Sequence, residues 1–208
     1  MTKSYAILID GGFVKRKLGT ARVPMDSVVL NRFVQALQEL PELRPHSLHR
    51  IYYYDAEPSA DVVKKPLSEE ILDFGKTDSF GRNRKLFAEL VRLPYFALRM
   101  GEVVFNGWRI PPKTLSVKQE SITLQADDFK PVVNQKGVDM RIGLDIASLT
   151  LKRQASIIVL VTGDSDFVPA MKFARKEGAQ LYLVPLNHGI REAMYEHADL
   201  VLHVPKEA

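Results

Sequence analysis

The sequence of 208 residues contains no cysteine. The chain therefore has neither a disulfide framework nor a thiolate-bound metal, and a metal ion would have to be held by oxygen or imidazole ligands. No apolar run approaches the roughly 20 residues that a membrane-spanning helix needs. The first apolar run, Ala6–Ile9, stops at Asp10 and is too short for a signal peptide. These absences argue against a secreted, disulfide-bonded protein and against a membrane protein, so we expect one cytoplasmic domain over residues 1–208 with no membrane partner.

Neither sign of charge dominates, because 29 Lys and Arg residues stand against 25 Asp and Glu residues, a formal net charge of +4. The basic residues nevertheless gather after the first apolar run and again in the middle of the chain. Such clusters are most often a solvated surface, but beside an acidic site they would contact a phosphate backbone. They comprise Lys15, Arg16, Lys17, Arg22, Arg82, Arg84, Lys85, Arg92 and Arg99.

Short apolar runs alternate with amphipathic segments along the chain. The runs predict strands over 5–10, 48–58, 156–163, 179–186 and 200–204. The amphipathic segments predict helices over 25–40, 82–94, 138–153, 167–178 and 190–198. Between these we expect a short helix near 68–74, one or two strands over 95–110 broken at Gly101 and Asn106-Gly107, and a small β-ribbon over 113–129, so that about 101–132 forms an insertion. The alternation predicts an α/β protein whose mainly parallel sheet is covered by helices on both faces.

Three aspartates follow two of the predicted core strands. Asp10 closes the first strand, and Asp164 and Asp166 follow the strand over 156–163. Because ligands of parallel sheets bind beyond the carboxyl ends of the strands, we expect these side chains to share one edge. Carboxylates so close would repel one another unless their pKa values rise or a cation binds. Mg²⁺ or Mn²⁺, which prefer oxygen ligands, are the cations that this set of side chains favours.

A fourth acid, Asp139, begins the helix predicted over 138–153, where the helix dipole stabilises a carboxylate. Asp145 follows six residues later and points well away from Asp139, since each residue turns the helix by about 100°. An aspartate beside a strand or helix is more often a cap or a turn residue, and Asp164 or Asp166 can cap the next helix. The combination of all four, with glycines that permit close backbone approach, favours a site.

Four segments in this order resemble the NYN domain family of PIN-like nucleases, and most closely its bacterial LabA-like branch: LIDGGF, QKGVDMRIGLDI, VLVTGDSDFVPAMKFARKEGAQLYLVPL and IREAMYEHADLVLHV. The resemblance spans about Tyr5 to Val204 and implies a PIN-like three-layer α/β/α sandwich. It also implies that an acidic cluster holds Mg²⁺ or Mn²⁺ and hydrolyses RNA phosphodiester bonds. The metal-binding and catalytic residues that it implies are Asp10, Asp139, Asp164 and Asp166, with support from Asp145, Thr162 and Ser165. Gly12 departs from the family, since many members have an Asn there.

The resemblance names RNA, single-stranded or structured, as the partner. Candidates to hold its backbone are Lys15, Arg16, Lys17, Arg82, Arg84, Lys85 and Lys136. Lys136 precedes Asp139 by one turn, so we expect it nearest the scissile phosphate. Phe80 and Trp108 can stack on unpaired bases, although packing in a core is the commoner role of such rings. A homodimer is a further expectation.

The sequence thus predicts a metal-dependent ribonuclease of the endonuclease type. A non-catalytic regulator that keeps the fold and binds RNA or protein is the alternative. A haloacid-dehalogenase-like phosphatase would need a second acid two residues after Asp10, and a Toprim domain would need Glu in its place. The glycines after Asp10 lack the GxGxxG spacing of a dinucleotide-binding loop. A small-molecule hydrolase would leave the basic segments without a role.

Overall fold

The computed structural model describes residues 2–115 and 121–205. Within these ranges seven strands form one sheet in the order β6-β5-β2-β1-β7-β8-β9. The parallel strands are β1 (Ser4–Asp10), β2 (Ser47–Glu57), β5 (Phe96–Arg109), β7 (Ile157–Val161), β8 (Gln180–Leu183) and β9 (Leu200–Val201). Only β6 (Lys130–Lys136) of this described sheet is antiparallel, and it pairs with β5. A separate hairpin joins β3 (Val62–Lys64) and β4 (Ile71–Asp73).

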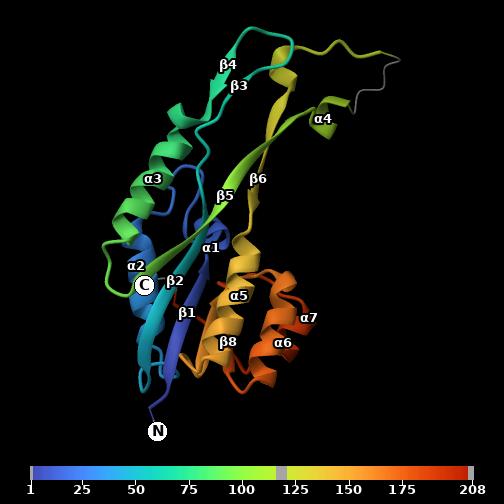
Figure 1. Cartoon of the computed structure of the whole chain (residues 1–208). Helices are drawn as coiled ribbons and strands as arrows, with labels where there is room; N and C mark the ends of the chain where they lie inside the picture. Colours follow the sequence, from blue (N-terminus) through green and yellow to red (C-terminus); the bar gives the residue numbers. More distant parts are fainter. Residues whose placement is uncertain (1, 116–120, 206–208) are drawn as a thin grey trace.

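Helices cover both faces of the sheet (Figure 1). On one face lie α1 (Gly11–Leu18), α2 (Ser27–Gln38) and α3 (Asp78–Leu90), and on the other α5 (Val138–Leu151), α6 (Val168–Lys176) and α7 (Glu192–Glu196). Side chains alternate between the two cores along β1, since Ile7 and Ile9 pack in the first and Ala6 and Leu8 in the second. The predicted fold class, a three-layer α/β sandwich with a mainly parallel sheet, is confirmed. None of the helices described is long and apolar enough to cross a membrane.

The distal half of β5 extends past the end of β2 and pairs only with β6. β5 pairs with β2 from Phe96 to Glu102 and with β6 from Glu102 to Arg109. The β5–β6 hairpin therefore projects beyond the carboxyl ends of the other strands, and it carries the short helices α4 (Pro112–Leu115) and η2 (Ala126–Asp128) (Figure 1). Aromatic side chains pack against one another on this hairpin. The ring of Phe105 lies 5.8 Å from the ring of Phe74 in η1 (Phe74–Lys76) and 5.7 Å from the ring of Trp108, measured between centroids.

Two predictions for this hairpin are wrong: the location of its second strand and the place where β5 ends. The polar and apolar alternation over 113–129 predicted a β-ribbon, but its described part contains α4, coil and η2, and residues 116–120 lie outside the described ranges. The strand that pairs with the distal half of β5 is β6, which was not predicted. Asn106-Gly107 does not break the strand at a turn either, because β5 runs through it with an irregular register and Gly107 at φ +88°. Pairing with β6 keeps the chain extended there.

Two further elements differ from the prediction. The segment 68–74 forms β4 and the start of η1, not a helix. Helix α1 was not predicted, because Gly11-Gly12 reads as a break after a strand. The Asp10 side chain caps this helix by accepting the Phe13 N–H, and the helix begins on the two glycines. The start of α1 thus lies directly at the end of β1.

Candidate functional site

Asp10 is fixed between a strand end and a helix start. Its Oδ1 accepts the Phe13 N–H at 3.0 Å, and its Oδ2 accepts the Thr162 hydroxyl at 3.1 Å. Burial raises the pKa of Asp10, and the negative charge of Asp139 raises it further. The two hydrogen bonds and the positive charge of Arg16 lower it, but the net effect is a rise. The Asp10 carboxylate is therefore held in one orientation, and a nearby cation would lower its raised pKa.

The loop after β7 supplies two further acids beside Asp10. Thr162 is fully buried, and its hydroxyl oxygen accepts the Asp164 N–H at 3.2 Å while it donates to Asp10. Asp164 Oδ1 accepts the Asp166 N–H at 2.9 Å and so caps η3 (Ser165–Phe167). Asp164 is the capping residue of this turn, whereas the Asp166 carboxylate bonds to no other described residue.

Asp139 reaches the same edge from the other face of the sheet. It lies exposed in the first turn of α5, after Gly137 at φ +76°. Burial raises the pKa of Asp139, and the charges of Asp164 and Asp166 raise it further. The structure thus brings Asp10, Asp139, Asp164 and Asp166 to one edge of the sheet, where the charges of Asp164 and Asp166 act on Asp139 and the charge of Asp139 acts on Asp10.

A cavity of about 340 Å³ opens at this edge. Asp10 and Asp164 contribute acids to its wall, while Arg16 and Arg191 contribute guanidinium groups. The ring of His188 completes the wall and packs on Phe13 at 5.9 Å between centroids. Carboxylates beside guanidinium groups suit a phosphate bound together with a cation.

The carboxylates fit a hard divalent cation by chemistry, although they do not form a preassembled site. No group of three His, Asp or Glu side chains within 2–115 and 121–205 is placed to hold a metal ion. The set is nevertheless all oxygen, and the pKa values of Asp10 and Asp139 are raised partly by negative neighbours, a repulsion that a cation would relieve. Metal binding would therefore require side-chain rotation, for which exposed Asp139 and Asp166 are suited.

A family model matches the part of the chain that contains three of these four aspartates. Residues 101–202 match the NYN domain. The NYN domain is a PIN-like family associated with ribonuclease activity. The matched stretch contains Asp139, Asp164 and Asp166, whereas Asp10 on β1 lies before it.

Two relatives extend the comparison. An uncharacterized protein of Methanocaldococcus jannaschii is 28% identical over 79 residues, which are 38% of this chain and 33% of that protein. The match thus spans about a third of that relative's length. A crystal structure of a protein of unknown function from Vibrio parahaemolyticus superposes with a TM-score of 0.54 at 14% identity, over 97% of this chain and 92% of that one. At that identity the likeness shows the shared fold.

The three residues predicted to support the four aspartates lie in different places. Thr162 bridges Asp10 and Asp164, and Ser165 lines the cavity. The structure does not bring Asp145 to the cluster. Its Oδ2 accepts the Tyr54 hydroxyl and Arg99 Nε, both at 2.9 Å, and burial together with the Asp145 charge raises the pKa of Tyr54. Asp145 thus points away from Asp139, as the helical spacing of the two residues predicted.

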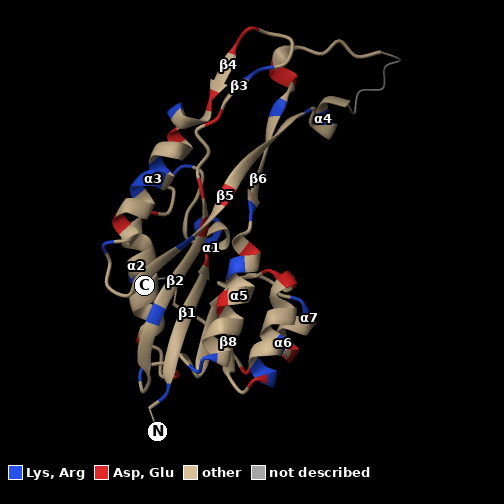
Figure 2. Ribbon diagram, in the orientation of Figure 1, with Lys and Arg blue, Asp and Glu red and all other residues tan. Residues whose placement is uncertain are grey.

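The candidate RNA-binding residues separate into two groups. Arg16 lines the acid cavity, Lys17 Nζ lies 3.1 Å from His188 Nδ1, and Lys136 ends β6 just before α5. The others lie along or beside α3, where Figure 2 shows several basic residues. Arg82 pairs with Asp78 at 4.0 Å, Lys85 with Glu89 at 3.9 Å, and Arg84 stands over the Phe80 ring at 6.0 Å. Lys15 turns toward the end of β2.

A buried aspartate at the end of β2 was missed by the sequence analysis. Asp55 is 1% exposed, and its Oδ2 lies 2.7 Å from Lys15 Nζ. The rule that selected Asp10 applies to it as well, because Asp55 follows the apolar run Ile51–Tyr54 at the same sheet edge. His188, Arg191 and Gln135 were also missed. They come from loops and from the unpredicted strand β6, so no periodicity marked them.

Proposed function

We propose that the protein is a divalent-metal-dependent ribonuclease that cleaves RNA phosphodiester bonds internally. The observation that carries this proposal is the convergence of Asp10, Asp139 and Asp164 from three different elements beside a cavity with Arg16 and Arg191. The NYN match over residues 101–202 supports the same reaction class. A homodimer, the limits of the 101–132 insertion and a cytoplasmic location remain predictions.

The residues around the cavity have separable roles in this proposal. Asp10, held by Phe13 and Thr162, would be the fixed ligand of the cation, and Asp139, Asp164 and Asp166 would supply the remaining carboxylates. When bound, Mg²⁺ or Mn²⁺ supplies charge neutralisation at the scissile phosphate and lowers the pKa of its water. Arg16 and Arg191, which line the same cavity, bind phosphate oxygens. Lys136, at the end of β6, contacts the same backbone.

Labelled single-stranded and structured RNA, incubated with Mn²⁺, Mg²⁺ or EDTA, tests the proposal. Asp10→Asn and Asp164→Asn should each lower the cleavage rate at least about 100-fold, because each removes charge that stabilises the transition state. Asp145→Asn is the matched control, an acid of α5 outside the cluster, and should stay within about threefold of wild type. Cleavage that survives EDTA or both cluster substitutions would overturn the mechanism.

One observation favours the alternative function, a non-catalytic regulator that binds RNA or protein. The described acids are not gathered as three metal ligands, as a preassembled catalytic centre would have them. Wild-type protein that binds RNA but leaves it intact in every metal tested would support the regulator.

A further inference from the structure

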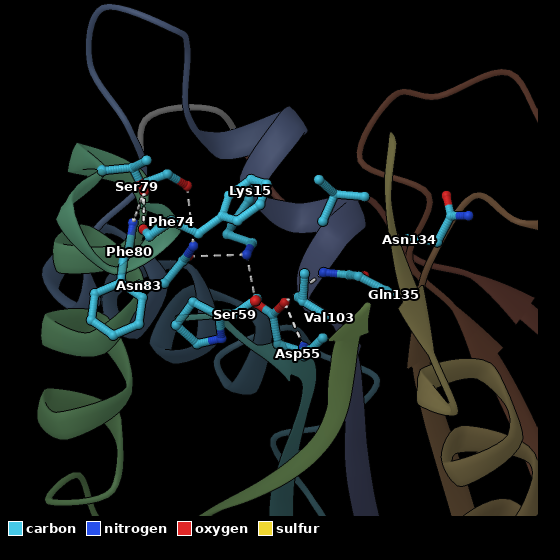
Figure 3. Close-up of a pocket in the computed structure, with 14 residues that line it drawn as sticks. Lys15, Asp55, Ser59, Phe74, Ser79, Phe80, Asn83, Val103, Asn134 and Gln135 are labelled. Carbon is cyan, nitrogen blue, oxygen red and sulfur yellow. Dashed lines mark hydrogen bonds and ion pairs between the residues drawn. The ribbon is translucent and has the colours of Figure 1, made fainter. Parts of the chain in front are cut away.

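A second cavity, of about 470 Å³, is lined by residues other than those of the acid cavity (Figure 3). It opens at the end of β2, between α1, the start of α3 and the β5–β6 hairpin. One side is polar, with Lys15, Asn83 and Gln135 around buried Asp55. The proposed cleavage reaction uses none of these four side chains.

Buried Asp55 orients the polar side of this cavity. Its Oδ2 pairs with Lys15 Nζ at 2.7 Å and accepts the Tyr53 hydroxyl at 3.1 Å. Its Oδ1 accepts Gln135 Nε2 at 3.0 Å and the Ala56 N–H at 2.9 Å. Asp55 is thus occupied by the protein itself, and it acts as a positioning residue for two neighbours that face the cavity.

The oriented side chains keep hydrogen-bonding capacity for a ligand. Lys15 Nζ also donates to Asn83 Oδ1 at 3.2 Å, which leaves one of its three N–H groups. Gln135 donates to Asp55 and retains its carbonyl as an acceptor, and Asn83 retains its amide donors apart from a long contact of 3.5 Å to Ser79. Figure 3 shows Lys15 between Asn83 and Asp55, with Gln135 reaching Asp55 from the other side. Donors and an acceptor on one edge match the edge of a nucleobase.

Apolar side chains form part of the remaining wall. Phe74 and Phe80 line it together with Val103 and Val133. Phe74 is held in place by Phe105, at 5.8 Å between ring centroids. Rings beside a hydrogen-bonding edge are what an unpaired base needs, since it stacks on one side and is read along its edge.

Gly12 lies close both to Asp10 of the acid cavity and to Gln135 of the second cavity. A Cβ built on this glycine would lie 3.4 Å from Asp10 Oδ1 and 3.7 Å from Gln135 Oε1. The fixed acid and the polar edge of the second cavity therefore lie on either side of one residue, a separation that a single nucleotide bridges. A chain with its phosphate at the acids would bring an adjacent base to this cavity.

We propose that the second cavity binds one unpaired nucleobase of a single-stranded RNA, next to the phosphate held at the acids. This inference rests on the proposed function, because the acid cavity supplies the phosphate position. The cavity selects unpaired RNA, because a base within a duplex is stacked and cannot enter. Asp55 positions Lys15 and Gln135, and Phe80 contributes a stacking surface.

Binding in EDTA tests the pocket separately from cleavage. The probes are a 12-nucleotide single-stranded RNA and a ribose-phosphate oligomer of equal length without bases. Phe80→Ala should weaken RNA binding about 10-fold, a typical effect of losing one stacking ring. The same variant should leave binding of the baseless oligomer unchanged. Tyr95→Ala is the matched control, since Tyr95 is 63% exposed and precedes β5 at the opposite edge; it should change neither affinity.

Ser79→Trp tests base binding in the second cavity independently, by filling the cavity. Ser79 is exposed and lines the cavity, so an indole there would fill it without removing a core side chain. This variant should also lose about 10-fold in RNA affinity and none for the baseless oligomer. If both variants keep the wild-type ratio of the two affinities while metal-dependent cleavage persists, the pocket proposal is overturned and the ribonuclease stands. If both variants lower the ratio of RNA affinity to baseless-oligomer affinity but no metal supports cleavage, the proposal of a base-binding cavity is supported and the proposal of a ribonuclease is overturned.

Discussion

Replacing Asp55 by alanine should destabilise the protein far more than replacing Asp145. The two residues are a matched pair, because each carboxylate pairs with a cation and accepts a tyrosine hydroxyl. They differ in exposure: Asp55 is 1% exposed and Asp145 is 22% exposed. The comparison therefore isolates what burial adds to the same set of contacts.

The magnitude follows from the groups that lose their partner. Asp55→Ala leaves the fully buried Tyr53 with an unpaired hydroxyl and removes the carboxylate from Lys15. Breaking a buried pair in this way costs about 3–5 kcal/mol, and we expect about 3 kcal/mol because Lys15 is 26% exposed and water reaches it. Asp145→Ala frees Arg99, which is 45% exposed, and removes the partner of the Tyr54 hydroxyl at a site that is 22% exposed. Water can take the place of the carboxylate there, so this variant should cost about 1 kcal/mol.

Thermal denaturation in EDTA measures this difference. For a chain of this length about 1 kcal/mol lowers Tm by about 2–4 °C, so Asp55→Ala should lose about 9 °C and Asp145→Ala about 3 °C. Tyr53→Phe removes only the hydroxyl and should fall between wild type and Asp55→Ala. A Tm of Asp55→Ala equal to or above that of Asp145→Ala would refute the buried network as the organiser of the second cavity.

Three further outcomes are expected. Gly11→Ala should destabilise the protein, since its Cβ would lie 2.5 Å from the Tyr54 carbonyl oxygen, whereas Gly12→Ala meets ordinary contacts and should gain up to about 1 kcal/mol in α1. In EDTA, Asp10→Asn should stabilise the protein at pH 7. Burial raises the pKa of Asp10, so above the ordinary aspartate pKa near 4 the folded state holds more protons than the unfolded state, and wild-type stability falls as the pH rises through the raised value. Mg²⁺ at about ten times its Kd should add about 1.4 kcal/mol, or about 4 °C, to wild type and much less to Asp10→Asn.

Each of these expectations has a contradicting result. Equal melting temperatures for the two glycine variants would contradict the close packing of Gly11 on β2. A stability gain of Asp10→Asn that persists at pH 3, where Asp10 is protonated in both states, would show that its charge is not the cause. An equal shift of both proteins in Mg²⁺ would place the cation elsewhere.

The sequence predicted the layers and the edge of the sheet well, because these follow from periodicity. Strands β1 and β7 are continuous apolar runs, and the aspartates that end them share an edge because the strands are neighbours and parallel. The same reasoning would have found Asp55 had it been applied to β2. The irregular elements were not predictable in this way. Helix α1 starts on two glycines, which read as a break, and its start depends on a cap from Asp10.

Tertiary pairing decided the remaining differences. Most residues of strand β6 are exposed, and the strand gains its conformation from pairing with β5, so its own sequence carries little signal. Gln135 reaches Asp55 only because of the β5–β6 register, and no local pattern encodes that register. The alternation over 113–129, by contrast, has no neighbouring strand in its described part and stays helical or coil.

Linearisation of a circular single-stranded RNA tests the central claim most directly, because a circle has no end for an exonuclease. With Mn²⁺ the wild-type protein should convert the circle to a line, Asp145→Asn should do so at a similar rate, and Asp164→Asn should not. Asp164→Asn suits this test because the Asn Oδ1 can still accept the Asp166 N–H that caps η3. Linearisation by Asp164→Asn at the wild-type rate, or a circle left intact by wild type in every divalent metal, would contradict the account.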